Sequence, residues 1–357
     1  MAVINVVQYG QTTMASVDTV TNVTITGVDT AAAFLIFGQE FAGGVNQPNR
    51  MLVQGRLTSP TNIQFVRTAT TAVGQFLTFN WFVPEFTSGV SVQRGELTLG
   101  ATTNNLAIAS VDTSQAFVLW THAADDASFS TDEFSHVKLT SATSIQAVVT
   151  AANAESGAYQ VVEFTGAGAS VQRGVEQFSG TTTASTVTIT AVNTTQSILL
   201  YNQTIAAGGG VAAAVAPLGH LLNGTTLEFL RSSTAGNRVI EMAWQVIEFL
   251  DGTGVQMGTA ALATATAQNI AIAAVDTLRS IAFIAGDRNR GGLTNNGGAD
   301  WGDNSWGRAL FLGIDSIQVA RFSADDTFTP AWFVAQFNTA AAEAAVVTDF
   351  SFVFSGF

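Results

Sequence analysis

The side chains able to do acid–base or metal chemistry are few and scattered. The 357-residue chain has three histidines, His122, His136 and His220, and no cysteine. No two histidines lie four residues apart and no H-E-x-x-H segment occurs, so their spacing does not favour zinc binding or a shared general base. We therefore expect isolated surface or loop histidines. The lack of cysteine excludes disulfides, thiolate nucleophiles and cysteine-ligated metal.

Carboxylates come in adjacent pairs rather than in a catalytic arrangement. The pairs are Asp125-Asp126, Asp132-Glu133 and Asp325-Asp326. Glycoside hydrolysis needs two carboxyl groups roughly 5 to 9.5 Å apart across a cleft, and neighbours in a turn do not supply this by themselves. The chain also lacks a G-x-S-x-G segment, a phosphate-binding glycine loop and a dinucleotide fingerprint. The sequence predicts no catalytic residue, no cofactor and no metal, and so a protein that is not an enzyme.

One polar segment, Gly286–Arg308, concentrates residues that suit a contact surface. It reads GDRNRGGLTNNGGADWGDNSWGR, with two tryptophans among glycines, asparagines and charges. Tryptophan on a polar loop is typical of an interaction surface. The candidate contact residues are Trp301, Trp306, Asp300, Asp303, Arg288 and Arg290. Three interpretations stay open: a subunit contact, an ordered loop without a ligand, or a sugar or Ca²⁺ site, although the acidic spacing misses the calcium-loop pattern.

The charge balance limits the partners. The chain has 13 Lys and Arg against 26 Asp and Glu, a formal net charge of −13. Partners that present phosphates, whether nucleic acid or anionic lipid, would mostly be repelled. Charged residues make up only 11% of the chain, against about 25% in an ordinary soluble domain. Polar uncharged residues, together with burial of apolar patches in an assembly, must therefore cover the surface.

No segment predicts insertion into a membrane. The most apolar run, Ile205–Leu222, is interrupted by glycines, Pro217 and His220, whereas a spanning helix needs about 20 predominantly apolar residues. No basic stretch followed by an apolar one opens the chain, so no secretory signal is expected.

Internal repeats carry most of the information in this sequence. A Val-Gln-x-Gly motif begins at Val7, Val92, Val171 and Val255, with spacings of 85, 79 and 84 residues. A second motif, apolar-x-apolar-x-x-Val-(Asp/Asn)-Thr, follows as VTITGVDT, LAIASVDT, VTITAVNT and IAIAAVDT. A third closes each copy as WFVPEF, YQVVEF, WQVIEF and WFVAQF. Three motifs in one order, four times, predict four copies of one structural unit.

The periodicity within each copy predicts β-strands. Apolar and polar residues alternate in the second and third motifs, as on strands with two different faces. Short apolar runs, FLIF, FVLW, ILLY and IAFI, have the length of buried strands. Asn223-Gly224, which joins HLL to TTLEFLR, predicts a tight hairpin, and LTSPTNI, LTSATSI and LGIDSI occupy the same place in the other copies.

These counts predict an all-β fold of four tandem antiparallel β-sandwich repeats, each of roughly 80–85 residues and six or seven strands. A propeller blade has about four strands, too few to account for one copy. We place the units at 1–88, 89–167, 168–252 and 253–357, which are called units 1 to 4 below. Unit 4 would carry the loop insertion and, in DFSFVFSGF, an added C-terminal strand that completes a sheet or crosses to a neighbour.

The repeated residues suggest structural roles. The glycine of Val-Gln-x-Gly would supply a bulge or a close backbone approach, and the Asp or Asn before Thr would bond its own backbone in a turn. The closing-strand carboxylates Glu85, Glu163 and Glu248 could pair with Arg67, Arg231 and Arg321. Val149 stands where unit 2 would need such an arginine, so this pairing is at most partial.

The VQRG, VTITAVNT and WQVIEF motifs together resemble the tandem β-sandwich repeats of bacteriophage virion proteins, among them tail-fibre-like and particle-surface components. The resemblance covers nearly the whole chain. It implies a non-enzymatic structural role in the virion, in a homo-oligomer that also contacts other virion proteins. The four sandwiches would then form a rod or an arc.

Two other functions remain open. An adhesin or receptor-binding module could hold a host-surface glycan with the Trp301 and Trp306 loop. A glycan-degrading enzyme would need two carboxylates that meet across a cleft.

Overall fold

The protein is built almost entirely of antiparallel β-strands. The computed structural model describes residues 1–43, 47–127, 133–152, 155–205, 212–286, 293–294 and 306–339. Each unit holds two three-stranded sheets, an inner and an outer one, and the same strand order recurs four times. The predicted all-β fold of repeated antiparallel sandwiches is thereby confirmed.

The inner sheets each have a long central strand that carries the closing motif. Unit by unit, and in spatial order across each sheet, they are β1 (Val3–Met14), β6 (Phe76–Ser88) and β3 (Ile36–Ala42); β7 (Val90–Thr98), β12 (Ser156–Phe164) and β9 (Ala116–Ala123); β13 (Ala169–Phe178), β18 (Ile240–Phe249) and β15 (Ser197–Ile205); β19 (Gly254–Thr259), β26 (Ala331–Gln336) and β21 (Ser280–Ile284). The Val-Gln-x-Gly motif lies on the first strand of each set, and the short apolar runs contribute to the third.

The outer sheets are shorter and more exposed. They are β2 (Val20–Thr24), β5 (Asn62–Val66) and β4 (Gln54–Ser59); β8 (Thr103–Ala107), β11 (Ser144–Val149) and β10 (Ser135–Ser141); β14 (Ala184–Thr188), β17 (Thr226–Leu230) and β16 (Leu218–Asn223); β20 (Ala267–Ala271), β24 (Ser316–Ala320) and β23 (Arg308–Gly313). The predicted hairpin is β16–β17, although Asn223 pairs with Thr226 and the turn itself is Gly224-Thr225. The Asn223 side chain accepts a hydrogen bond from the Thr225 amide at 2.9 Å, which fixes the turn.

The remaining elements are short. They are α1 (Pro48–Met51), α2 (Ala212–Val215), the 3₁₀ turns η1 (Thr194–Gln196), η2 (Ala235–Asn237) and η3 (Thr277–Arg279), and the two-residue pair β22 (Leu293–Thr294) with β25 (Phe328–Thr329). The predicted C-terminal strand lies outside the described residues.

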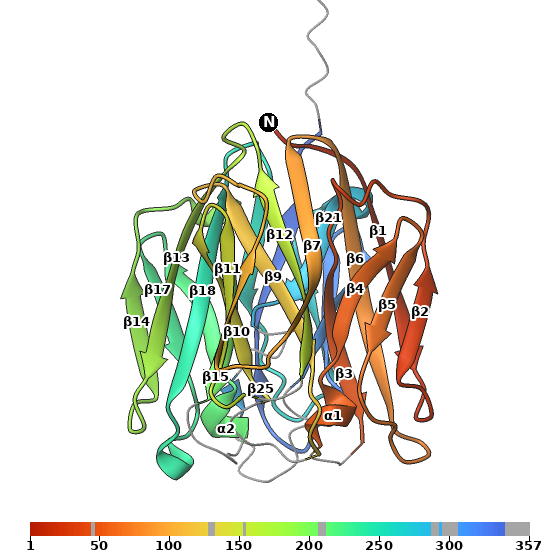
Figure 1. The fold of residues 1–357 in the computed structure, drawn as a ribbon, viewed down its shortest axis with the longest axis vertical. Helices are drawn as coiled ribbons and strands as arrows, with labels where there is room; N and C mark the ends of the chain where they lie inside the picture. The colour runs from red at the N-terminus through yellow and green to blue at the C-terminus, as the bar shows by residue number, and fades with distance from the viewer. Residues whose placement is uncertain are drawn as a thin grey trace, which may run out of the picture.

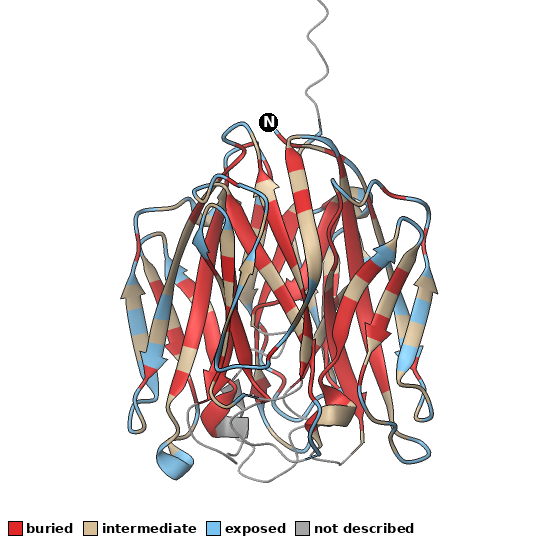
Figure 2. Ribbon diagram, viewed as in Figure 1, coloured by how far each residue is buried: buried red, intermediate tan, exposed pale blue. Residues whose placement is uncertain are grey.

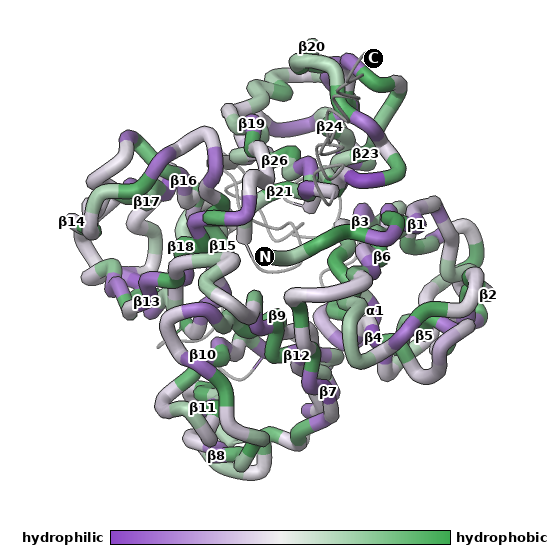
Figure 3. Tube along the Cα trace, turned by 90° about the horizontal axis from the view of Figure 1, so that it is seen from above, coloured by the Kyte–Doolittle hydropathy of each residue, from purple (hydrophilic) through white to green (hydrophobic). Residues whose placement is uncertain are grey.

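The four units close into a ring around one axis, as Figure 3 shows from above. One edge strand of each outer sheet, β4, β10, β16 or β23, packs on the inner sheet of the next unit. The same contact recurs around the ring until unit 4 meets unit 1. There the Ile4 amide donates to the Asn338 carbonyl at 3.0 Å, and Arg308 lies 2.9 Å from Glu40. The expectation of a rod or an arc is therefore wrong.

The closing strand β6 ends on the side of the ring where the N-terminus lies (Figure 1), with Phe86 opposite Ile4. Four phenylalanines, Phe86 among them, form a closed set of ring contacts there. They are the last residues of the four closing motifs, Phe86, Phe164, Phe249 and Phe337. Their ring centroids are 5.5, 5.3, 6.0 and 5.1 Å apart around a closed square. Edge contacts of this kind are favourable beyond the area they bury, so the tetrad ties the four units together.

Burial falls from the axis to the rim, as Figure 2 shows. The apolar interiors of units 1, 3 and 4 merge into one cluster with seven buried residues of unit 2: Val90, Val92, Phe117, Ala124, Phe134, Val162 and Phe164. Other buried residues of unit 2 form a cluster of their own around Trp120 and Ile145. The units are thus sandwiches in topology whose cores are largely shared at the axis.

Candidate functional site

The glycine of each Val-Gln-x-Gly motif makes room for an aromatic ring on the adjacent strand. Gly174 faces Trp244 in the sheet register, and a Cβ there would lie 2.5 Å from the indole. The same relation joins Gly10 to Trp81, Gly95 to Tyr159 and Gly258 to Trp332. The close approach at these glycines is made by an aromatic side chain and not by another backbone, which corrects the prediction, because the missing Cβ leaves room for the ring.

The glutamine of the motif clamps the second motif to the inner sheet. Gln8 accepts from the Thr26 amide at 2.8 Å and donates to the Thr26 carbonyl at 2.9 Å. The same two-way contact recurs between Gln93 and Ala109, Gln172 and Thr190, and Gln256 and Ala273. An amide side chain suits this position because it offers one donor and one acceptor in a plane.

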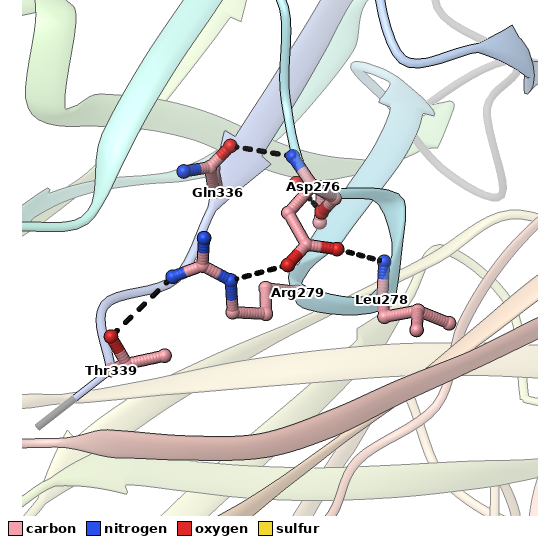
Figure 4. A network of polar contacts seen from close by, with 6 residues as sticks. Asp276, Leu278, Arg279, Gln336 and Thr339 are labelled. Atoms are coloured by element: carbon pink, nitrogen blue, oxygen red, sulfur yellow. Dashed lines mark hydrogen bonds and ion pairs between the residues drawn. The ribbon is translucent and has the colours of Figure 1, made fainter.

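The second motif ends in a turn that its own Asp or Asn and the closing strand hold together (Figure 4). In unit 4, Asp276 accepts from the Leu278 amide at 3.0 Å, and its own amide donates to Gln336 at 2.9 Å. Arg279 adds an ion pair to Asp276 at 2.8 Å. The predicted side-chain to backbone bond is made four times, by Asp29, Asp112, Asn193 and Asp276.

The closing carboxylates serve this same turn. Glu85, Glu163 and Glu248 accept from the amides of Asp29, Asp112 and Asn193 at 2.6 to 2.7 Å. Gln336 can replace a glutamate there because its amide oxygen accepts equally well. Hydrogen bonds from Ser114 and Gln115 hold the pKa of the Asp112 carboxyl below its usual range.

The buried arginines bind backbone carbonyls, so their predicted pairing with these glutamates is wrong. Arg67 is 1% exposed and donates to the carbonyls of Asp18 and Ala15 at 2.8 and 2.7 Å. Arg231 and Arg321 make equivalent sets of bonds. A guanidinium can satisfy several carbonyls at once because its donors lie in a rigid fork. Burial lowers the pKa of Arg67 and of Arg231.

Polar side chains join unit 1 to unit 2 and unit 2 to unit 3. Gln160 accepts from the Leu35 amide and donates to the Leu35 carbonyl, both at 2.8 Å. Gln245 does the same to Val118, again at 2.8 Å. The variable residue of Val-Gln-x-Gly adds a second contact, because Arg94 donates to the Ala33 carbonyl at 2.5 Å.

Apolar side chains occupy the same positions at the other two junctions. Phe333 and Phe82 replace the glutamines. Met257 and Tyr9 replace the arginines. At the closure between units 4 and 1, Phe311 packs 5.9 Å from Phe82 and 6.1 Å from Tyr9. These equivalent positions therefore form hydrogen bonds at two junctions of the ring and carry apolar side chains at the other two.

A groove lies at the junction of units 1 and 2. Its volume is about 410 Å³, against about 90 Å³ and 240 Å³ at the next two junctions. Its walls are Arg56, Leu57 and Thr58 on β4, Arg94, Gly95 and Glu96 on β7, and Ala158, Tyr159 and Gln160 on β12. Arg56 is ion-paired with Glu96 and donates to Gln64 at 2.7 Å.

The axial cavity is much smaller, about 60 Å³. It is lined by residues of β3, β9, β15 and β21, together with Gln160 and Gln245. A space of this size has room for a few water molecules.

The histidines lie on strands and each contacts a glutamate, so the expectation of isolated surface or loop histidines is wrong. His122 and His136 are fully buried. His122 Nε2 lies 2.8 Å from the Glu133 carbonyl oxygen and 3.7 Å from a Glu155 carboxylate oxygen. Because His122 and Glu155 expose no side-chain surface, a substrate has no access to them.

The other two histidines both contact glutamates of unit 3, one across the junction and one within the unit. His136 Nε2 reaches Glu241 of unit 3 at 2.8 Å. This hydrogen bond, with the charges of His136 and Lys138, holds the pKa of Glu241 below its usual range. His220 reaches Glu228 within unit 3 at 2.8 Å. The three contacts are separate and form no shared site.

Trp306 lies in the core, which corrects its assignment as a surface contact residue. Its side chain is 1% exposed and belongs to the large apolar cluster. Alignment of β23 with β4, β10 and β16 puts Trp306 at the position of Leu52, Phe134 and Ala216, all of them buried. The other candidates, Trp301, Asp300, Asp303, Arg288 and Arg290, lie outside the described residues.

Among the described residues, no group of three or more His, Asp or Glu side chains is arranged to hold a metal ion. No described helix has both the length and the apolar character to cross a bilayer. Comparison with protein-family models gives no match to this sequence, and comparison with curated proteins gives none either.

Proposed function

We propose that this protein is a non-catalytic structural component of a bacteriophage virion, at the tail, a fibre or the head surface. It acts there as a rigid ring that packs against further copies and other virion proteins. The proposal rests on the resemblance of its three motifs to tandem virion repeats.

One structural observation supports a building role. Three sets of side chains that recur in the motifs make contacts within the ring: the motif glutamines bond the second motif, the closing carboxylates bond the turn, and the closing phenylalanines pack on one another. The closing tryptophans Trp81, Trp244 and Trp332 bury their indole N–H groups without a hydrogen-bond partner, so these groups are not directed to an accessible surface. A repeated residue that serves a ligand would instead be expected to point an unbonded polar atom toward an accessible surface. These repeated contacts therefore make the ring rigid.

Mass spectrometry of purified phage particles from the source of this sequence tests the proposal directly. We expect the chain among the virion proteins, with antibody label on the tail or the head surface by electron microscopy. Its absence from particles whose other structural proteins are all recovered would reject the proposal.

Glycan binding is a second candidate, favoured by the groove between units 1 and 2. Its volume of about 410 Å³ lies in the range of small-molecule sites. Arg56, Arg94 and Glu96 offer the planar polar groups that bind sugar hydroxyls.

A glycan array separates this candidate from the loop interpretation. Loss of binding in Arg56→Ala, but not in Lys138→Ala at the equivalent position of the next groove, would place the sugar in the first groove. Loss only in Trp301→Ala would place it at the loop. A wild-type chain that binds no glycan would reject both.

A further inference from the structure

Among the strands that the structure describes, each unit has one at the rim of the ring whose outer edge pairs with no other strand. The outer sheets have the orders β2-β5-β4, β8-β11-β10, β14-β17-β16 and β20-β24-β23. The far edges β4, β10, β16 and β23 face the next unit, whereas β2, β8, β14 and β20 lie at the periphery, one on each unit (Figure 3). Four equivalent edges are therefore open to solvent.

The backbone direction of these strands is fixed by their inner pairing. On β2, the Arg67 amide donates to the Thr19 carbonyl and the Ile25 amide to the Thr61 carbonyl. Residues an even number of positions from Thr19 therefore bond β5, while Val20, Asn22 and Thr24 direct their N–H and C=O groups outward. The same pattern follows on the other three strands from the bonds of Thr102, Thr183 and Thr266 with the neighbouring strand.

These edges lack the features that keep natural edges apart. Exposed edge strands usually carry lysine, other charges or proline, which prevent another chain from adding to the sheet. The four sequences here are VTNVT, TNNLA, ASTVT and AQNIA. None contains a charge or a proline, although the chain as a whole has a net charge of −13. Like-charge repulsion between two copies is therefore smallest where the edges meet.

The middle residue of each edge is placed for symmetric pairing. It is Asn22, Asn105, Thr186 or Asn269, and each is exposed with its backbone groups outward. The three asparagines among these residues each lie at the end of a row of side-chain amides that crosses the outer sheet. Gln64 donates to Asn22 at 3.2 Å, Gln146 to Asn105 at 3.0 Å, and Gln318 to Asn269 at 3.0 Å.

We propose that these edges bind the same edges of other copies of this chain, as antiparallel strand pairs. A two-fold axis through the middle residue would set Asn22 opposite Asn22 and Val20 opposite Thr24. Every outward N–H and C=O on the two strands then has a partner, and the amide rows continue from one copy into the next. An isologous contact of this kind is self-complementary. Because there are four edges, association continues beyond a dimer.

Edge pairing would be the contact through which the proposed structural role operates. It rests on the proposed function only because both require copies of the chain to assemble. Sedimentation velocity of the full chain over a concentration series tests it. We expect the wild-type chain to form dimers and larger species. The variant with Asn22→Lys, Asn105→Lys, Thr186→Lys and Asn269→Lys should remain a single copy, because like charges would oppose each other on every two-fold axis.

A matched control adds the same four charges elsewhere on the same sheets. Thr58→Lys, Thr140→Lys, Leu222→Lys and Leu312→Lys are equivalent exposed positions on the hairpins, and this variant should associate as the wild type does. A wild-type chain that stays a single copy throughout would overturn the inference. So would equal association of the two variants, or equal loss in both.

Hydrogen exchange gives a readout without substitution. The amides of Val20, Asn22 and Thr24 should become protected as the protein concentration rises. Unchanged exchange in a sample that has associated would place the contact elsewhere. If the chain is found in virions but remains a single copy in solution, edge pairing is rejected and the proposed function stands. If the edges pair but the chain is absent from virions, the proposed function is rejected and edge pairing stands.

Discussion

The junction of units 2 and 3 and the junction of units 3 and 4 have the same geometry and opposite chemistry. Gln245 bonds both backbone groups of Val118 across the first. At the second, Phe333 takes its place and is 1% exposed. It lines a groove together with His220 and Leu221 of unit 3 and stacks 5.4 Å from Phe283 of its own unit. The same position of the closing motif thus carries an amide at one junction and a ring at the next.

The difference teaches that ring closure depends on the shape of the interface more than on one kind of bond. A net hydrogen bond contributes about 1 kcal/mol, whereas an unpaired buried backbone group costs about 1–3 kcal/mol. The amide at the polar junctions is therefore needed because the edge it faces is buried. The aromatic junctions depend instead on packed area.

The largest effect should come from the contact between the motif glycine and the closing-strand indole, which units 3 and 4 share. Gly174→Val and Gly258→Val each place a side chain where Cβ already lies 2.5 to 2.8 Å from an indole carbon. We expect each to lower the free energy of unfolding by at least about 3 kcal/mol, as measured by urea denaturation. A large loss at one junction and none at the other would show that the units differ inside as well as between.

Truncation of the aromatic contact should come next. Phe333→Ala removes a buried ring, and we expect a loss of about 3–5 kcal/mol. Gln245→Ala leaves the N–H and C=O of Val118 without partners, with an expected loss of about 2–4 kcal/mol. Urea denaturation of both variants against wild type checks the order, and a Gln245→Ala variant as stable as wild type would mean that the amide is dispensable.

Gln245→Glu separates hydrogen bonding from packing at the polar junction. A carboxylate can accept from the Val118 amide but cannot donate to the Val118 carbonyl, and burial disfavours its charge. Its pKa in the folded state should therefore be raised. The variant should match wild type most closely at pH values below the ordinary glutamate pKa of about 4.3 and lose stability as the pH rises through the folded-state value. Phe333→Glu should also regain some stability at low pH, because burial disfavours its charge too. It has no matched backbone contact, so it should remain well below wild type even there.

The smallest effect concerns the His136–Glu241 hydrogen bond across the junction of units 2 and 3. The pKa of Glu241 is lowered by its hydrogen bond with His136, so this contact stabilises the fold above the ordinary glutamate pKa and is lost as the pH falls through the lower, folded-state value. Glu241 is one-third exposed, and we expect Glu241→Gln to cost less than about 1 kcal/mol at neutral pH. The variant should also show a shallower loss of stability in acid, and an unchanged acid profile would contradict the assignment.

The repeats and strands could be predicted because their signals are local. Alternation marks the strands, and the Asp or Asn before Thr makes its turn within two residues, as at Asp276. The position of Trp306 was also within reach of the sequence: it precedes its hairpin by the same interval as Leu52, a core residue. The polar composition of the surrounding segment obscured that match.

The closed ring could not be predicted in this way. It depends on how Gln160 and Arg94 meet a neighbouring unit, and neither residue belongs to a pattern that specifies an angle between units. The buried histidine did leave a signal, since Val118, Trp120 and His122 alternate on β9 and all three are buried. Its carboxylate neighbour, Glu155, is 33 positions away, so sequence spacing could not bring the two together.

The square of phenylalanines at the axis also bears on the origin of the chain. Four equivalent rings in mutual contact are what four separate copies of one short polypeptide would form as a symmetric tetramer. Fusion of the four genes would preserve that contact while freeing each copy to change alone. Glutamine could then become phenylalanine, and arginine tyrosine or methionine, at two junctions and not at the others. A single unit expressed on its own, with the polar junction residues of unit 2, is accordingly the natural starting point for rebuilding the ancestral ring.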